Sequence, residues 1–313
     1  MLENDTTARE IKLSKDKVLL VDSMNWAYRA NIVFGNGKKG KVGNVLDPNT
    51  KEVIPVVFEE KEDEGKESFT AVFNFFRNLR ALIEQFDPDK VFFCLEGDCC
   101  FRKELFSEYK ANRIIKTGSE DKQKKRDDFL RQYDIMLKLL KYLPITQVKS
   151  NRYEADDVIA TLVSTLRDEE LIVISSDKDY IQLLQKGYDN LKVYSHNLKN
   201  YVVPPDYHFL TFLTLNGDTS DNIPSLISKK KAIAIASDPE KLAEFLSVEE
   251  NRANYSLNKQ LVEFKIIEDE ELEFSEYNVD FDALKEEFSW MEFETILEDK
   301  YWERFVETFE RLR

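Results

Sequence analysis

The sequence predicts an α/β protein in which helices flank a mostly parallel central sheet, followed by a smaller helical domain. Short apolar runs alternate with amphipathic stretches from residue 17 to residue 203, an order typical of parallel strands joined by crossover helices. After Pro239 the pattern is helical. Apolar residues make up 42% of the 313 residues, enough for a sizeable core. We therefore expect one domain over residues 1–203 and a second over residues 204–313.

Each expected strand is a short apolar run, and each expected helix has apolar residues at helical spacing. Strands are predicted at residues 17–21, 91–95, 145–148 and 171–175, with a hairpin of residues 192–195 and 201–203. Helices are predicted at residues 69–86, 127–143, 153–166, 239–245, 258–266 and, with breaks, 283–313. Ser68 is a candidate N-cap for the first helix, and Trp290 and Trp302 are expected in the core. Residues 35–66 contain five glycines and are expected to form an exposed insertion or a loose hairpin.

Composition argues against several classes of protein. No apolar run approaches the roughly 20 residues that cross a bilayer, and the polar residues 1–17 have the features of neither a signal nor a transit peptide. Three cysteines cannot make a disulfide framework, so we expect a reducing cytoplasm. The two histidines, His196 and His208, lack the spacing of zinc ligands.

The negative charge is concentrated near the C-terminus. Residues 238–313 hold 23 acidic and 9 basic residues, which accounts for most of the net charge of −15. Residues 102–126 instead hold 9 basic and 4 acidic residues. The sequence therefore predicts a nearly neutral body with a basic arm and an acidic C-terminal region.

Acidic residues directly follow three of the expected strands. Asp22 ends the first, Glu96 follows the second with Asp98 close behind, and Asp177 follows the fourth with Asp179. The carboxyl ends of parallel strands are where open α/β sheets place their sites. Each acid alone could simply solvate a loop, but three such coincidences favour a functional site.

Two further acidic groups have both a structural and a functional interpretation. Glu154, Asp156 and Asp157 begin an expected helix, where acids complement the helix dipole, yet three close carboxylates also favour a divalent cation. Asp218 and Asp221 lie in the run GDTSDNIP of residues 217–224, where an Asx-turn and a helix cap are the structural alternative.

Together these nine carboxylates indicate metal-dependent chemistry, since no catalytic His, Cys or Ser candidate is evident. Oxygen ligands select Mg²⁺ or Mn²⁺ over zinc. Two such ions suit phosphodiester hydrolysis, in which one activates water and both stabilise the phosphate. The chain has no Gly-x-x-x-x-Gly-Lys phosphate loop, which argues against hydrolysis of nucleoside triphosphates.

The basic arm, expected at about residues 101–130, is a candidate nucleic-acid contact. It could neutralise several phosphates and stack a base on Tyr109, although a solvated helix face is the alternative. Its candidate contacts are Arg102, Tyr109, Lys110, Arg113, Lys116, Lys122, Lys124, Lys125 and Arg126.

The motifs resemble those of the 5'-nuclease family, which comprises flap endonucleases and the 5'-3' exonuclease domains of bacterial DNA polymerases. The matching stretches are VDSMNWAYRA at residues 21–30, FCLEGDCCFRKELFSEYKANR at 93–113, YEADDVIATL at 153–162, SSDKDYIQLL at 175–184 and GDTSDNIP at 217–224. YEADD, ISSDKD and the segment KVYSHNLKNYVV look most like the T-even bacteriophage ribonuclease H branch. The resemblance implies a PIN-like core, a helical arch formed by the basic arm, and a helix-three-turn-helix element opening the C-terminal domain.

The resemblance also implies roles for individual residues. Asp22, Glu96, Glu154, Asp156 and Asp157 would be ligands of a first metal site, and Asp177, Asp179, Asp218 and Asp221 would serve a second. Lys110 and Arg113 would act on the scissile phosphate, with Arg102 and Tyr109 near the 5' strand. The cofactor would be two Mg²⁺ ions, for which Mn²⁺ can substitute.

The sequence departs from the family pattern in two places. The family usually has Asp where Glu96 stands, so either Glu96 or Asp98 could hold the metal; Glu96 is favoured because it follows the strand directly. A glycine-rich hairpin normally follows GDxSDNIP, but here Lys229, Lys230 and Lys231 come after residues 225–228. These lysines would then contact duplex DNA in place of the hairpin.

The function implied is a divalent-metal-dependent 5' nuclease that removes RNA primers and 5' flaps during DNA replication. Its substrates would be DNA and RNA–DNA duplexes with 5' ends or flaps, and a single-strand-binding protein or sliding clamp is a candidate partner of the expected monomer. The alternatives are a PIN-type ribonuclease and a structure-specific DNA-binding protein without catalysis.

Overall fold

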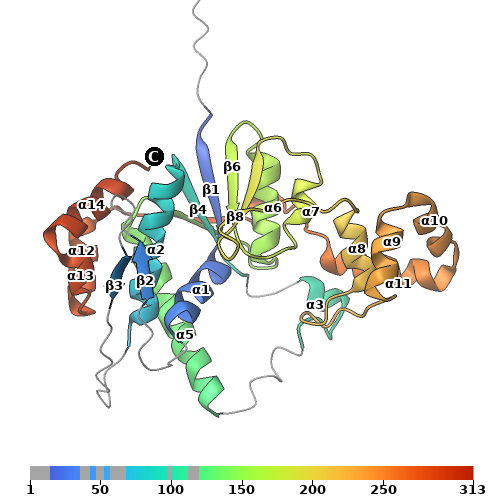
Figure 1. Cartoon of the computed structure of the whole chain (residues 1–313), viewed down its shortest axis with the longest axis horizontal. Coiled ribbons are helices and arrows are strands. Elements are labelled where there is room, and N and C mark those ends of the chain that lie inside the picture. The colour runs from blue at the N-terminus through green and yellow to red at the C-terminus, as the bar shows by residue number, and fades with distance from the viewer. Residues whose placement is uncertain are drawn as a thin grey trace, which may run out of the picture.

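A twisted, mostly parallel sheet forms the centre of the molecule (Figure 1). The computed structural model of the chain describes residues 15–35, 43–46, 53–56, 68–97, 101–111 and 120–312. Within these residues seven strands pair in the order β8-β7-β6-β1-β4-β5-β9. The strands are β1 Lys17–Asp22, β4 Lys90–Cys94, β5 Thr146–Lys149, β6 Glu170–Ile174, β7 Leu191–Ser195, β8 Asn200–Tyr201 and β9 Glu273–Ser275. The pairs from β7 to β5 are parallel, and the edge strands β8 and β9 are antiparallel to their neighbours.

The register of the central strands brings their carboxyl ends to one edge. In β1, Asp22 lies opposite Cys94 of β4, and Val21 lies opposite Ile174 of β6. The apolar residues Val18 to Val21 are buried, since helices cover both faces of a parallel sheet. The acidic residues that follow β1, β4 and β6 therefore emerge side by side.

Helices cover the sheet on both faces. One face packs on α1 Ser23–Gly35, α2 Thr70–Phe86 and α5 Glu120–Leu139, and the other packs on α6 Ala155–Thr165 and α7 Ile181–Leu184. The short turn η1 Leu140–Tyr142 continues α5. Leu19 and Val21 of β1 belong to the first core, whereas Val18 and Leu20 belong to the second. This alternation follows from the two-residue period of a strand.

The region after residue 203 does not form one helical unit. Helices α8 Phe209–Asn216, α9 Lys229–Ala236, α10 Pro239–Ser247 and α11 Glu249–Val262 share their own apolar cluster on one side of the sheet. Helices α12 Phe281–Trp290, α13 Glu294–Leu297 and α14 Asp299–Phe309 instead pack into the core beside α2, on the opposite side of the molecule (Figure 1). Within residues 204–313, helices α8–α11 thus pack separately from helices α12–α14, which lie beside α2.

Most predicted elements are confirmed within a few residues, and the differences are local. The helix expected at residues 258–266 is α11, which runs from Glu249 to Val262 and so begins nine residues earlier than predicted. Helices α1 and α8 and strand β9, with the preceding turn η2 Asp269–Glu271, were not predicted. Strands β2 Gly43–Leu46 and β3 Val53–Val56 pair antiparallel, as a hairpin would, and residues 36–42, 47–52 and 57–66 of the predicted insertion lie outside the described residues. The N-cap of α2 is Phe69, without a side-chain cap, so the expectation for Ser68 was wrong.

The two tryptophans of the C-terminal helices differ in burial. Trp302 is buried and stacks on Phe305 at 5.4 Å between ring centroids, as expected. Trp290 was expected in the core, but it is 69% exposed, and its ring lies 5.3 Å from that of Phe69 between centroids. In the described part of the chain, no helix is long and apolar enough to cross a membrane.

Candidate active site

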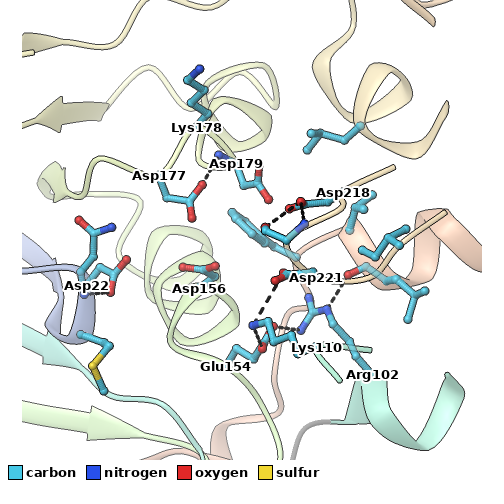
Figure 2. A pocket seen from close by; sticks show the side chains of 18 of the residues that line it. Asp22, Arg102, Lys110, Glu154, Asp156, Asp177, Lys178, Asp179, Asp218 and Asp221 are labelled. Atoms are coloured by element: carbon cyan, nitrogen blue, oxygen red, sulfur yellow. Dashed lines mark hydrogen bonds and ion pairs between the residues drawn. The ribbon is translucent and has the colours of Figure 1, made fainter. Parts of the chain in front are cut away.

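An acidic cavity of about 580 Å³ opens at the carboxyl edge of the sheet, between the α/β body and the α8–α11 unit. Eight of the nine predicted carboxylates line it, and Figure 2 labels seven of them, all except Glu96. They are Asp22, Glu96, Glu154, Asp156, Asp177, Asp179, Asp218 and Asp221. The structure therefore brings together acids that lie up to two hundred residues apart in the sequence.

Asp22 is held at the end of β1 by two hydrogen bonds. Its carboxylate accepts from the backbone N–H of Asn25 at 3.1 Å and from Ser175 Oγ at 3.0 Å. Burial raises the pKa of Asp22 to about 7, and the charges of Glu96 and Asp177 add to this shift. The side chain is thus fixed in place while its negative charge lacks full compensation within the protein.

Glu96 reaches the cavity from the loop after β4. Its carboxylate accepts from the backbone N–H of Ala155 at 3.2 Å, which joins this loop to the start of α6. A Cβ on the next residue, Gly97, would lie 2.1 Å from the carbonyl oxygen of Ser150, so a side chain there would force the loop away. Asp98, the alternative ligand, lies outside the described residues.

The start of α6 directs two carboxylates into the cavity. Glu154 is the N-cap, and Asp156 accepts a short hydrogen bond from the buried hydroxyl of Tyr180. Burial raises the pKa of Asp156, and Asp22 and Asp177 raise it further. Burial alone would raise the pKa of Glu154, but the charges of Lys110 and Arg102 lower it. The cluster around Asp156 therefore has the greater need of a cation.

Asp177 and Asp179 occupy the loop after β6. The backbone N–H of Asp179 donates to Asp177 at 2.9 Å, and that of Asp177 donates to Ser175 Oγ at 3.1 Å. Burial raises the pKa of both carboxyls, and the charges of Asp218 and Asp221 raise it further. The loop after β6 and the 217–224 segment are thus electrostatically coupled across the cavity.

The 217–224 segment is a tight loop that presents Asp218 and Asp221. Asp218 and Ile223 exchange two backbone hydrogen bonds of 3.0 and 2.7 Å, and Asp218 also accepts from the N–H of Ser220 at 2.7 Å. Gly217 has a φ of 65°, which favours glycine. The predicted Asx-turn is confirmed, and the same turn brings both aspartates to the cavity wall.

The base of the basic arm packs against this loop. The backbone N–H of Lys110 donates to the carbonyl of Asp221 at 2.9 Å, and Asn222 donates through its amide to the carbonyl of Glu108 at 2.9 Å. The ammonium of Lys110 pairs closely with Glu154 and lies 3.9 Å from Asp221 (Figure 2). Lys110 is therefore a cation within the acidic wall.

Three predicted residues have a different environment from the one expected. Tyr109 is 3% exposed and its hydroxyl donates to Glu154 at 2.9 Å, so its ring is not available to stack a base. Asp157 is completely buried and does not line the cavity. Its carboxylate binds the guanidinium of Arg102, itself only 2% exposed, at 2.5 and 2.8 Å. Arg102 and Asp157 are thus each other's partners, and Arg102 also lines the cavity. The roles predicted for them in DNA contact and metal binding stay predictions.

The remaining basic candidates lie away from the cavity or outside the described residues. Lys122 lies on α5, Lys124, Lys125 and Arg126 are exposed on that helix, and Lys229, Lys230 and Lys231 are exposed in the first turn of α9. Arg113 and Lys116 lie outside the described residues. Their contact with nucleic acid stays a prediction.

Sequence reasoning missed the residues that hold the carboxylates in place. Tyr180, Ser175 and Asn25 each bind an acid of the site through a hydrogen bond, and Lys178 lines the cavity between two aspartates. A signal was present for Tyr180 and Lys178, which lie within the run SSDKDY beside the acids.

The donor set fits hard divalent cations. Among the described residues, no group of three or more acidic, histidine or cysteine side chains already stands in a metal-coordinating arrangement. Mg²⁺ usually keeps several waters and binds one or two carboxylates together with substrate phosphates, so it does not require such a closed cage. Burial and neighbouring carboxylates raise the pKa values of Asp22, Asp156 and Asp177, and a bound cation removes the repulsion between such charges. The division of the acids between two metal sites stays a prediction.

The sequence is similar to known 5'-3' exonucleases. Residues 17–207 match the family model of the 5'-3' exonuclease N-terminal resolvase-like domain. A 5'-3' exonuclease of Bacillus subtilis is 30% identical over 250 residues, which cover 75% of this chain and 74% of that protein. DNA polymerase I of Lactococcus lactis is 26% identical over 281 residues, covering 83% of this chain; the chain thus spans only 28% of the polymerase.

Solved structures have the same fold. The bacteriophage T5 D15 protein, crystallised with metal ions, has a TM-score of 0.57 at 17% identity, covering 93% of this chain and 99% of that one. The same T5 flap endonuclease in a complex with DNA and metal ions has a TM-score of 0.54 at 18% identity, covering 94% of this chain and 99% of that one. The narrower likeness to the T-even bacteriophage branch stays a prediction. The family match over residues 17–207 and the coverage of the Bacillus relative establish that this chain belongs to the 5'-3' exonuclease family.

Proposed function

We propose that the protein is a divalent-metal-dependent 5' nuclease that hydrolyses phosphodiester bonds and removes RNA primers and 5' flaps during DNA replication. The observation that supports this best is one cavity lined by eight carboxylates from five segments, with Lys110 in its wall beside Glu154 and Asp221. The names of the relatives and the DNA and metal ions in the T5 flap endonuclease complex agree with it. DNA and RNA–DNA duplexes with 5' ends or flaps are the proposed substrates.

The chemistry divides between the metal ions and the protein. Bound divalent ions supply an activated water and neutralise charge on the phosphate. Asn25, Ser175 and Tyr180 hold Asp22 and Asp156 in fixed positions, so that the ligands need little rearrangement. Lys110, held between Glu154 and Asp221, is placed to stabilise negative charge that develops on the scissile phosphate.

The proposal is tested with a purified chain and a labelled RNA–DNA hybrid or DNA duplex with a recessed 5' end. We expect short products from the 5' end in Mg²⁺ or Mn²⁺ and none in EDTA. Tight binding of these duplexes without any product in Mg²⁺ would instead support a DNA-binding protein without catalysis. Two Mg²⁺ ions, a monomeric state and a single-strand-binding or clamp partner stay predictions.

Metal binding is expected to release protons near neutral pH. The pKa of Asp22 is about 7 in the metal-free protein, so part of the population holds a proton there, whereas a metal ligand must be ionised. The apparent Mg²⁺ affinity should therefore increase as the pH rises through that value. Calorimetric titrations in two buffers of different ionisation enthalpy measure the protons released. Equal heats in both buffers, at a pH one unit below this pKa, would mean that no proton is released. That result would contradict the assignment of Asp22 as a metal ligand.

The three lysines at the start of α9 are expected to contact duplex DNA as flexible point charges. Replacing Lys229, Lys230 and Lys231 together by Ala should weaken duplex binding and lower the salt slope by up to about three, with little effect on single strands. A control removes three exposed lysines that lie outside α9 and do not line the cavity, Lys138, Lys141 and Lys300. We also expect the protein to bind duplex DNA with equal affinity in KCl and NaCl. A clear preference for potassium would contradict the prediction that these lysines contact the duplex in place of the glycine-rich hairpin.

A further inference from the structure

The buried ion pair of Arg102 and Asp157 joins three segments of the chain at one point. Arg102 comes from α3 Phe101–Leu105 at the base of the basic arm, and Asp157 comes from the first turn of α6. Besides the two bonds between them, Arg102 Nε donates to the carbonyl of Leu261 at 2.7 Å and Nη2 donates to that of Glu263 at 3.1 Å. The arm, α6 and the end of α11 therefore meet at this pair.

Asp157 also accepts hydrogen bonds from two backbone N–H groups at this junction. Its carboxylate accepts from the backbone N–H of Lys265 at 2.8 Å and from that of Glu154 at 3.3 Å. The second bond is half of a capping box, in which Glu154 and Asp157 each satisfy a backbone N–H of the other. The orientation of Asp157 thus fixes the N-cap of α6.

The same junction bears directly on the cavity. Arg102 Nη1 lies 3.2 Å from Glu154 Oε2, and Glu154 and Asp156 are the two carboxylates that α6 presents to the site. A shift in the first turn of α6 would move both of them. Misplacement of catalytic groups by about 1 Å can cost about 10² in rate.

We propose that Arg102 and Asp157 are positioning residues that set the first turn of α6, and with it Glu154 and Asp156, relative to the arm and α11. This inference rests on the proposed nuclease function. It assigns Asp157 no contact with metal and Arg102 no contact with DNA. A buried ion pair is often no more stabilising than apolar residues of similar volume, although breaking one partner is costly. Stability and positioning can therefore be separated experimentally.

The central variant replaces both partners, Arg102→Met with Asp157→Leu, and is compared with Asp157→Asn, Arg102→Lys and wild type. We expect Asp157→Asn to lower thermal stability, because the buried guanidinium loses its partner. The double variant should recover much of that stability. Its single-turnover cleavage rate should nonetheless stay lower by about 10², with duplex affinity within about threefold of wild type.

Two readouts do not depend on cleavage. Hydrogen exchange at the amides of residues 154–157 should be faster in the double variant than in wild type. The Mg²⁺ affinity should fall while the number of ions bound stays the same. If wild type does not cleave any substrate, the proposed function fails, but these two measurements still test the positioning role.

A control uses the partly exposed ion pair between Arg304 of α14 and Glu84 of α2, whose bidentate bonds are 2.8 and 2.9 Å long and which lies on the opposite side of the molecule. Arg304→Met with Glu84→Leu should leave cleavage and metal affinity unchanged. A double variant at Arg102 and Asp157 that cleaves at the wild-type rate would overturn the proposal. So would the loss of one bound ion in Asp157→Asn, which would make Asp157 a ligand, or a reduced salt slope in Arg102→Lys, which would make Arg102 a DNA contact.

Discussion

Replacing Asp156 by Asn is expected to abolish cleavage while leaving duplex affinity within about tenfold of wild type, because the change removes a metal ligand and no DNA contact. Asp156 lies in the cavity within the electrostatic reach of Asp22, Asp177 and Glu96. Asn keeps the shape of the side chain and can still accept from Tyr180. Asp177→Asn should have the same effect. Single-turnover cleavage and equilibrium DNA binding measure the two parts of the prediction.

The stability of the metal-free variant provides an internal check. The pKa of Asp156 is raised in the folded protein, so its ionisation costs stability as the pH rises above the unfolded value. Asp156→Asn removes that cost and should raise the melting temperature of the metal-free protein near neutral pH. Asp168→Asn, at an exposed site outside the cavity, serves as the control. Full activity of Asp156→Asn in Mg²⁺ would contradict the assignment of the site.

Replacing Lys110 by Ala is expected to lower the cleavage rate by about 10² to 10³, the scale of one lost electrostatic donor. Lys110 is the arm residue whose ammonium is paired with Glu154 inside the cavity. Lys124 is exposed on α5 and does not line the cavity. Lys124→Ala should instead weaken binding and lower the salt slope by about one, with little effect on the rate of bound substrate.

Comparison of these two variants distinguishes a catalytic lysine from a merely electrostatic one. Rates are measured at saturating enzyme, so that weak binding does not lower the observed value. Equal changes in rate and salt slope for Lys110→Ala and Lys124→Ala would mean that the arm acts as a uniform positive surface. That outcome would not affect the assignment of the acidic cavity as the active site, but it would contradict a catalytic role for Lys110.

The sheet was predictable because each of its central strands is a continuous apolar run, as burial on both faces requires. The short edge strand β9 was not predicted, since its sequence EFS offers no alternation long enough to recognise. The burial of Trp302 and the exposure of Trp290 could not be distinguished, because both lie in amphipathic helices whose orientation is set by packing on α2. The same long-range packing separates α12–α14 from α8–α11.

Six of the eight cavity carboxylates were predictable because strand ends and the start of a helix converge at one sheet edge. Asp218 and Asp221 were predicted instead from the run GDTSDNIP at residues 217–224. Asp157 was assigned to the same site as Asp156, yet adjacent residues of a helix point in different directions. That periodicity could have excluded one of the two. The burial of Arg102 and Tyr109 could not be predicted, because it depends on their contacts with α11 and the 217–224 loop, more than a hundred residues away.

The central claim is that this acidic cavity is a metal-dependent 5' nuclease site. Product mapping on a nicked duplex with a 5' flap, made of either RNA or DNA and labelled at its 5' end, tests it most directly. In Mg²⁺ we expect cleavage close to the junction of flap and duplex and short products from the 5' end. In EDTA we expect no product. Cleavage within single-stranded RNA that needs neither a duplex nor a 5' end, or binding of the flap duplex without any product in Mg²⁺, would contradict the claim.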